Sequence, residues 1–410
     1  MKVIDLFAGA GGLSEGFRRE GYDIIAHVEM DESASYTLKT REAFYYLNAH
    51  DKLDVYKDYL LGRITRDEFY QSIPEDILSR VINSEISDDT ISGIFKKVDN
   101  LLGDDSVRMI IGGPPCQAYS VAGRSRDPER MQNDPRNFLY KQYIKFLVKY
   151  QPELFVFENV SGILSASNGE IFENIQKEMN DAGYILDYKI LNAKDYGTLQ
   201  SRKRVILIGW RSEIKYTYPQ FEKLELNDTI RDLFEDLPDL QAGECIPPGE
   251  FYQDIDQESY VMRYLRYDNW NLLTHHIARP NKQRDLDIYR LCVQHWNDYG
   301  TKLKYNELPN DLITHNNVNS FLDRFNIVPF DGISHTVVAH ISKDGHHYIH
   351  PDMNQNRSIT VREAARIQSF PDNYYFETSR TAAFKQIGNA VPPLMAQQIA
   401  KKIKIDFFGE

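Results

Sequence analysis

The sequence predicts a protein of the α/β class, built on a mostly parallel sheet, and three features carry this prediction. A buried strand is expected over residues 3–7, and it leads directly into a glycine-rich turn and a helix. A second buried strand, expected over residues 108–111, stops abruptly at the Gly-Gly-Pro-Pro run of residues 112–115. Further apolar runs alternate with helical patterns up to about residue 210. Such alternation favours parallel strands whose following turns gather at one edge of the sheet.

The bulk composition is that of a globular protein with a sizeable core. The chain has 410 residues, 42% hydrophobic and 26% charged, which suggests two or three domains or one large domain with an insertion. A net charge of −12 argues against a generally basic nucleic-acid-binding surface but allows a local basic cleft. The three cysteines show no disulfide framework and no metal-ligand spacing, so we expect no metal site and a reducing, cytoplasmic compartment. We expect neither a signal peptide nor a membrane span.

The first strand–turn–helix unit is a candidate cofactor site. Backbone N–H groups at the start of the helix expected over residues 13–19 are free to bind an anion. A second strand, over residues 24–28, ends at Glu29, an acidic residue placed to accept ribose hydroxyls. Ser14 stands where the dinucleotide fingerprint needs its third glycine, so S-adenosylmethionine, which has a ribose but no phosphate, fits better than a dinucleotide. Taken alone, the turn could equally be a tight connection made for packing.

Cys116, the residue after the two prolines, is the candidate nucleophile. It is expected at the carboxyl edge of the sheet, where open α/β proteins keep their chemistry. A rigid turn that presents one thiol suits covalent catalysis by cysteine. A lone cysteine is more often a small buried hydrophobe, but the Pro-Pro-Cys-Gln setting favours the nucleophile.

A basic segment follows this cysteine. Residues 122–137 have the composition of a loop and hold four arginines, Arg124, Arg126, Arg130 and Arg136. Arginines in such a loop suit phosphate contacts, although an ordinary solvated loop has the same composition. Beside a reactive thiol, we interpret the segment as a lid that closes over a nucleic-acid substrate.

Two later strands carry further charged candidates. The strand expected over residues 154–157 ends at Glu158, whose carboxylate could lie beside the thiol or could simply cap a helix or form a salt bridge. The run Gln-Ser-Arg-Lys-Arg of residues 200–204 leads into a strand at 205–209. Arg202 and Arg204 alternate, so we expect both on one face, as an anion clamp on the substrate side or as a solvated edge.

The expected domain organisation follows from where the pattern changes. We expect a catalytic domain over residues 1–212, with a helical insertion at about 31–100 that covers one edge of the sheet and contains a third strand. Residues 213–378 lose the alternation and are expected to form a separate recognition domain, and 379–410 to return to the catalytic domain. Strand alternation with a hairpin turn is expected within residues 334–350. The final expected elements are a helix at 360–368 with Thr360 and Glu363 as a capping box, a turn at 386–393 and a helix at 394–403.

Six blocks, in this order, resemble the motifs of the C5-cytosine DNA methyltransferases. They are Asp5 to Gly12, Gly113 to Gln117, Glu158 to Val160, Gln200 to Arg204, Arg362 to Gln368, and Gly388 to Pro392. Together they extend over nearly the whole chain, and the plan is similar to the bacterial restriction–modification enzymes without extra regulatory domains. The resemblance implies a Rossmann-like S-adenosylmethionine-dependent methyltransferase domain with a mixed sheet and a smaller target-recognition domain.

The resemblance also implies an activity. It is methyl transfer from S-adenosylmethionine to C5 of a cytosine flipped out of double-stranded DNA, at a specific sequence, with S-adenosylhomocysteine as product. A cognate restriction endonuclease is the implied functional partner, from which the methylation would protect host DNA.

The implied site residues fall into three groups. Catalytic roles go to Cys116, Glu158, Arg202 and Arg204. Cofactor contacts go to Phe7, Ala8, Gly9, Gly11, Gly12, Glu29, Met30, Glu85, Pro115, Asn389 and Ala390. DNA contacts go to Gln117, Ser120, Arg124, Arg126 and Gln200. Glu85 departs from the family pattern, because the acidic residue that contacts adenine usually follows a recognisable glycine, which is absent here.

Three other functions compete with this interpretation. A cytosine-C5 methyltransferase acting on transfer RNA shares most of these motifs, but the aromatic-rich recognition region is larger than that task requires. A non-catalytic DNA-binding protein on the same fold is disfavoured by the intact Cys116, Glu158 and Arg202. A nicotinamide dehydrogenase is disfavoured by Ser14.

Overall fold

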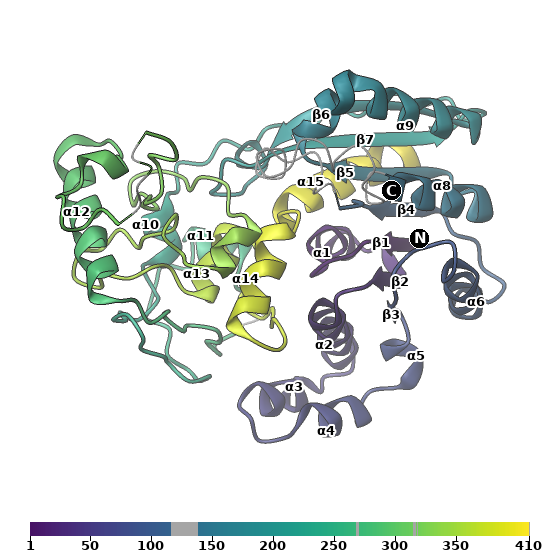
Figure 1. The fold of residues 1–410 in the computed structure, drawn as a ribbon. Coiled ribbons are helices and arrows are strands. Elements are labelled where there is room, and N and C mark those ends of the chain that lie inside the picture. The colour runs from purple at the N-terminus through teal and green to yellow at the C-terminus, as the bar shows by residue number, and fades with distance from the viewer. Residues whose placement is uncertain (116–137, 268–269, 315–316, 318, 410) are drawn as a thin grey trace.

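The core of the protein is a seven-stranded mixed sheet with the order β3-β2-β1-β4-β5-β7-β6 (Figure 1). The computed structural model describes residues 1–115, 138–267, 270–314, 317 and 319–409. The strands are β1 Lys2–Leu6, β2 Asp23–Glu29, β3 Val81–Asn83, β4 Met109–Gly112, β5 Leu154–Asn159, β6 Tyr184–Asn192 and β7 Lys203–Arg211. Strands β3, β2, β1, β4 and β5 are parallel, whereas β7 is antiparallel to both β5 and β6. The predicted α/β class with a mixed sheet is confirmed.

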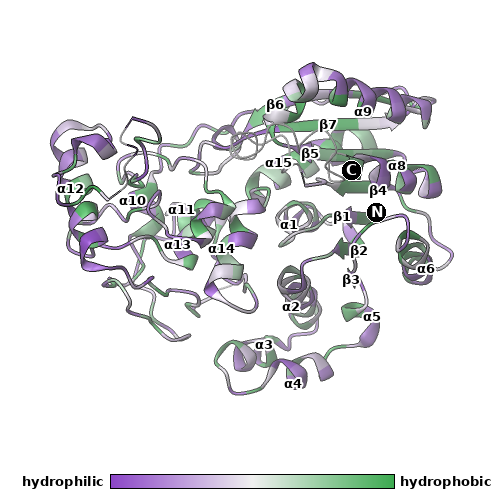
Figure 2. Ribbon diagram, viewed as in Figure 1, coloured by the Kyte–Doolittle hydropathy of each residue, from purple (hydrophilic) through white to green (hydrophobic). Residues whose placement is uncertain are grey.

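Helices cover both faces of this sheet. They are α1 Gly12–Arg19, α2 Glu32–Ala49, α6 Ile91–Leu102, α8 Leu139–Tyr150, α9 Glu170–Asp181 and α15 Pro393–Ile403. One apolar cluster joins Ile4 and Phe157 to α6, α8 and α9, and another joins Val3 and Ile111 to α1 and α15. Neighbouring residues on one strand therefore enter opposite layers, which explains why the strands are apolar almost throughout. Figure 2 shows this as hydrophobic strands between helices whose outer surfaces are hydrophilic.

The two ends of the chain pack together. Helix α15 lies against α1, and the Tyr22 hydroxyl donates to the Ala400 carbonyl at 3.0 Å. A Cβ on Gly12 would lie 2.2 Å from the Val391 carbonyl oxygen, so only glycine allows this approach. Short helical turns complete this part: η3 Ser161–Gly169, η4 Ala193–Asp195 and η7 Lys404–Phe408.

The stretch 31–100 differs from the expected insertion over the sheet edge. It supplies α2 and α6 to the sheet layers, and β3 is itself the edge strand. The stretch also contains α3 Leu53–Leu60, α4 Arg66–Gln71 and α5 Glu75–Leu78, which extend beyond the edge strand β3. Tyr56 and Phe69 are buried there with Trp270 and Leu272, which come from the segment expected to form the recognition domain. The aromatic residues therefore attach this stretch to residues 270–272, which the local sequence pattern could not indicate.

Residues 213–389 are poor in regular structure. Their helices are α10 Ile230–Phe234, α11 Tyr260–Tyr264, α12 Gln283–Tyr299, η5 Tyr305–Glu307, η6 Ala339–Ser342, α13 Val361–Ile367 and α14 Arg380–Asn389. The capping box of Thr360 and Glu363 is confirmed. The expected strands and hairpin at 334–350 are wrong, because this segment contains the short helix η6 at 339–342 and otherwise makes only isolated bridges with other segments. The expected turn at 386–393 begins only after α14 ends.

Buried ion pairs hold this region together. The Arg366 guanidinium bonds to Asp236 at 2.6 Å and to Asp372 at 2.8 Å, with all three side chains fully buried. Helices α13 and α14 pack in the same apolar cluster as residues 230–273, whereas α15 returns to the sheet. Among the described helices, none has the length and apolar character needed to cross a membrane.

Candidate active site

The glycine turn after β1 lies beside the end of β2. The two strands pair in parallel, with Leu6 opposite Val28, so residues 7–12 and Glu29 meet at one sheet edge. Gly11 has φ +77°, and a Cβ there would lie 2.8 Å from the Leu38 side chain, so both backbone and space favour glycine. The Tyr374 hydroxyl donates to the Ala10 carbonyl and holds the turn from the C-terminal part of the chain.

Glu29 is fixed at this edge by two backbone groups. Its Oε2 accepts from the Gly9 N–H at 2.8 Å, and its Oε1 accepts from the Asp31 N–H at 2.7 Å. Burial raises the pKa of Glu29 above its usual value of 4.5, although these hydrogen bonds oppose the shift. Next to it, Met30 is 62% exposed, an unusual place for a large apolar side chain. A fixed carboxylate, a glycine turn and an open apolar side chain suit a nucleoside that carries no phosphate.

Two other predicted cofactor residues lie exposed on neighbouring elements. Glu85 follows β3, and Glu29 pairs with Asn83 in the parallel register, so Glu85 lies beyond the same sheet edge. Asn389 ends α14, and Ala390 follows it with its carbonyl bonded to Gln368 at 2.7 Å.

The ends of β4 and β5 meet at the turn that leads to the predicted nucleophile. A Cβ on Gly113 would lie 2.6 Å from Glu158 Oε2 and 2.8 Å from the Glu158 carbonyl oxygen. Asn159 donates from Nδ2 to the Pro114 carbonyl at 3.2 Å. The Glu158 carboxylate therefore lies directly against the backbone shortly before Cys116.

Several predicted residues lie outside the described part of the chain. They are Cys116, Gln117, Ser120, Arg124 and Arg126. Pro115, the last described residue before them, is exposed. Within the described residues, no group of three or more His, Cys, Asp or Glu side chains is arranged to hold a metal ion.

Glu158 forms an ion pair with Arg204. Arg204 Nε lies 2.7 Å from Glu158 Oε1, and the two side chains are 12% and 14% exposed. The antiparallel pairing of β5 with β7 places Glu158 opposite Ile206 and so brings the start of β7 to this edge. Arg204 thus pairs with Oε1 of the carboxylate, and the other oxygen, Oε2, faces Gly113.

Arg202 is not beside Arg204 in an anion clamp. Its side chain is fully buried, and it donates to the Val337 carbonyl at 2.6 Å and the Gly388 carbonyl at 3.0 Å. Burial and the nearby Arg204 charge lower the pKa of Arg202 well below its usual value. The alternation argument fails because β7 begins only at Lys203, so Arg202 precedes the strand. In this arrangement Arg202 joins the start of β7 to the segment around Val337 and to α14.

Gln200 does not fit its predicted DNA contact either. It is fully buried, its amide donates to the Ile367 carbonyl at 3.2 Å, and its oxygen accepts from the Val337 N–H at 2.8 Å. An amide whose groups are bonded inside the protein has none to offer a base or phosphate.

Sequence reasoning missed the residues that hold the site from a distance. Asn159 could have been noticed, because it follows Glu158 directly. Tyr374 and Val337 give no such signal, since each meets the site through a contact across more than one hundred positions of the chain. Gly388 begins one of the six blocks, but nothing in the sequence indicates its contact with Arg202.

Comparisons with known proteins show the family to which the chain belongs. The model of the C-5 cytosine-specific DNA methylase family matches residues 1–74 and 68–405. The chain is 43% identical to the type II methyltransferase M.Bpa9945I of Bacillus paralicheniformis, covering 98% of both chains, and 31% identical to the type II methyltransferase M.AgeI of Thalassovita gelatinovora, covering 99% of both. A prophage-encoded E. coli protein described as a DNA modification methyltransferase has the same fold, with a TM-score of 0.66 at 23% identity and complete coverage of both chains. The chain therefore belongs to the C-5 cytosine-specific DNA methylases and is a DNA (cytosine-5)-methyltransferase of the type found in restriction–modification systems.

Proposed function

We propose that Cys116, Glu158 and Arg204 form the catalytic centre, at the edge where β4, β5 and β7 end. The contact of Glu158 with the backbone of Gly113 carries this proposal, because it holds the carboxylate against the turn that leads to Cys116. Asn159 and Arg204 fix the turn and the carboxylate from either side.

The reaction begins with the Cys116 thiolate. It adds to C6 of cytosine, which breaks the conjugation of the ring and makes C5 an enamine-like carbon nucleophile. The carboxylate of Glu158, paired with Arg204 through Oε1, can only accept hydrogen bonds, so it must first take up a proton from solvent on Oε2. The protonated Glu158 would then donate to N3 and stabilise the charge that develops there. S-adenosylmethionine supplies an electrophilic methyl group on a sulfonium and leaves as S-adenosylhomocysteine. Once C5 carries the methyl group, loss of the C5 proton and departure of the Cys116 thiolate restore the aromatic ring.

The cofactor site proposed for S-adenosylmethionine is the turn of residues 7–12 with its neighbours. Glu29 would accept the ribose hydroxyls, Met30 would cover the adenine, and Glu85 would approach the adenine amino group. Pro115, Asn389 and Ala390 would border the reactive end. The fixed Glu29 carboxylate and the exposed Met30 support this assignment.

The proposed substrate is double-stranded DNA with a specific target sequence. C6 of a paired cytosine is inaccessible, so the base must be flipped out, at a cost of about a few kcal/mol. Residues 213–378 would read the target, and Gln117, Ser120, Arg124 and Arg126 would contact DNA around the flipped base. The type II relatives support a role in protecting DNA in the cytoplasm from a cognate restriction endonuclease.

A mechanism-based trap tests the catalytic centre. Duplex DNA with 5-fluorocytosine in the target should give a covalent complex, because fluorine cannot leave C5 as a cation. Cys116→Ser should abolish both the complex and methyl transfer, whereas Cys245→Ser, at an exposed cysteine, should form the complex as the wild type does. A covalent complex with Cys116→Ser would refute the assignment of the nucleophile. Methylation of RNA but not of duplex DNA of the same sequence would refute the assignment of the substrate.

A further inference from the structure

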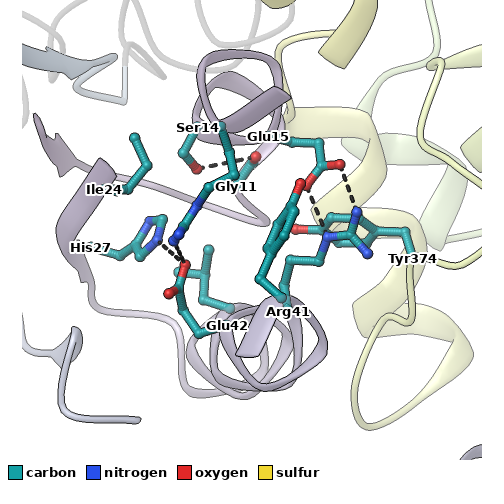
Figure 3. A pocket seen from close by; sticks show the side chains of 11 residues that line it. Gly11, Ser14, Glu15, Ile24, His27, Arg41, Glu42 and Tyr374 are labelled. Carbon is teal, nitrogen blue, oxygen red and sulfur yellow. Dashed lines mark hydrogen bonds and ion pairs between the residues drawn. The ribbon is translucent and has the colours of Figure 1, made fainter. Parts of the chain in front are cut away.

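A small cavity lined by charged side chains lies beneath the glycine turn (Figure 3). Its volume is about 10 Å³, too small for any ligand larger than a water molecule. Gly11 and Ser14 form one side, and His27, Glu42, Glu15 and Arg41 contribute charge from α1, β2 and α2. So many buried charges directly under the proposed cofactor turn require a role beyond filling space.

His27 is at the centre of this group. Its Nδ1 lies 3.2 Å from Asp5 Oδ2, and its Nε2 lies 3.2 Å from Glu42 Oε1. All three residues are at most 4% exposed. A neutral imidazole has only one N–H, so it can donate to only one of the two carboxylates, whereas the imidazolium donates to both.

The surrounding charges favour the imidazolium. Burial by itself lowers the pKa of His27, but the hydrogen bonds and charges of Asp5 and Glu42 outweigh burial and raise the pKa above its usual 6.5. Glu42 in turn pairs with Arg18 and lies 3.8 Å from Arg80. The other ionisable groups around the cluster are Asp23 beside Arg80, Glu15 with Arg41 and Arg19, Tyr45 across the cavity, and Tyr143, which faces Asp5.

The position of His27 connects it to the cofactor turn. Asp5 and His27 are partners in the register of β1 and β2, and each lies two residues before a proposed cofactor contact, Phe7 and Glu29 respectively. Glu42 comes from α2, which begins just after Glu29. The imidazolium therefore ties together the three elements that place the turn and the ribose carboxylate. Loss of its proton would leave one ring nitrogen as an acceptor that faces a buried carboxylate oxygen, either that of Asp5 or that of Glu42, which would then keep only Arg18 as a hydrogen-bond donor among the described residues. Such a contact between two buried acceptors is costly.

We propose that His27 is a positioning residue for S-adenosylmethionine, and that cofactor affinity depends on the charge of its imidazolium. This inference rests on the proposed cofactor site. Because the pKa of His27 is raised, the imidazolium is fully present below pH 6.5 and is lost as the pH rises through the higher value. Affinity should therefore fall on the alkaline side.

Equilibrium binding tests the inference better than turnover, because the turnover rate also depends on the chemical steps at Cys116. The affinity of the full chain for S-adenosylhomocysteine is measured by calorimetry from about pH 6 to about pH 9. The wild type should lose about tenfold in affinity if the cofactor raises the pKa of His27 by about one unit. His27→Gln should bind more weakly at pH 6 and show no such fall. His50→Gln, at an exposed histidine that caps the other end of α2, should keep the wild-type profile.

A second measurement applies even if His27→Gln does not fold. By reciprocity, cofactor binding must raise the pKa of His27 in the wild type, which carbon-13 labelling of the histidine rings can follow by NMR. A wild-type affinity that is flat with pH, or a His27 pKa that the cofactor leaves unchanged, would overturn the inference. Either result would leave the proposed cofactor site itself intact. A failure of that site would be seen separately, as an affinity for S-adenosylhomocysteine that Glu29→Ala leaves unchanged.

Discussion

Gly113→Ala is the most direct test of the contact between Glu158 and the nucleophile turn. The added Cβ would lie 2.8 Å from the Glu158 carbonyl oxygen, about 0.6 Å closer than the 3.4 Å at which ordinary contact begins. The carboxylate Oε2, at 2.6 Å, can swing away, but the carbonyl belongs to β5 and cannot move without the strand. The turn before Cys116 must therefore shift away from Glu158.

Two effects of this substitution can be estimated. Overpacking of this kind costs about 1–3 kcal/mol of unfolding free energy. A misplacement approaching 1 Å in a catalytic group costs on the order of 100-fold in rate. We therefore expect kcat to fall by about 100-fold. The affinity for S-adenosylhomocysteine should change much less, because Pro115 is the one proposed cofactor contact on this turn and the others lie on other elements.

The assay is transfer of a labelled methyl group to a duplex that contains the target, together with thermal unfolding and calorimetry. Gly93→Ala is the matched control, since a Cβ on that helical glycine meets nothing within 4 Å, and it should keep full activity. A Gly113→Ala protein with wild-type kcat would refute the reasoning that this close contact positions the catalytic groups.

Two further predictions concern carboxylates. Glu29→Ala should weaken S-adenosylhomocysteine binding by about 10- to 100-fold, the value of hydrogen bonds to a charged group, while Glu32→Ala, exposed on the first turn of α2, should not. Because the pKa of Glu29 is raised, the carboxylate begins to be protonated at a pH above 4.5, and the affinity of the wild type for the cofactor product should begin to fall there as the pH decreases. Calorimetry that shows equal affinity for the wild type and Glu29→Ala would contradict the ribose role. Asp372→Asn should destabilise the fold by about 3–5 kcal/mol, because it leaves Arg366 without one of its buried partners. The pKa of the Asp372 carboxyl is about 2, below the usual 3.8, so its contribution to stability is present above pH 3.8 and is lost as the pH falls toward 2. Thermal unfolding across that pH range should show a loss of stability in the wild type that the Asp372→Asn variant lacks.

The sheet and much of the site could be predicted because they depend on local pattern. Strands buried on both faces are apolar throughout, and the carboxyl ends of parallel strands must share an edge. From these two rules Glu29 was expected beside the turn of residues 7–12, and the structure bonds it to Gly9. The same reasoning placed Glu158 near the turn before Cys116, where it contacts Gly113.

The remainder depends on contacts between distant segments. Helix α14 needs glycine at position 388, because a Cβ there would lie 2.3 Å from the Ala339 backbone nitrogen. Nothing near Gly388 in the sequence reveals that neighbour. The segment around Val337 looked like a strand, yet its backbone bonds to Gln200 and Arg202 in place of a sheet partner. Arg202 was misplaced for the same reason, because its partners come from two segments far along the chain.

The packing of α15 on α1 has a consequence for how the protein is made. Val391 lies against Gly12, Ala400 accepts from Tyr22, and Tyr374 holds Ala10, so the first strand–turn–helix unit is completed by residues translated long after it. A nascent chain on the ribosome has the turn of residues 112–115 long before it has these supports of the proposed cofactor site. Competence to modify DNA should therefore arise only after residue 400 has been synthesised, and a fragment cut short before residue 374 should be unable to acquire it.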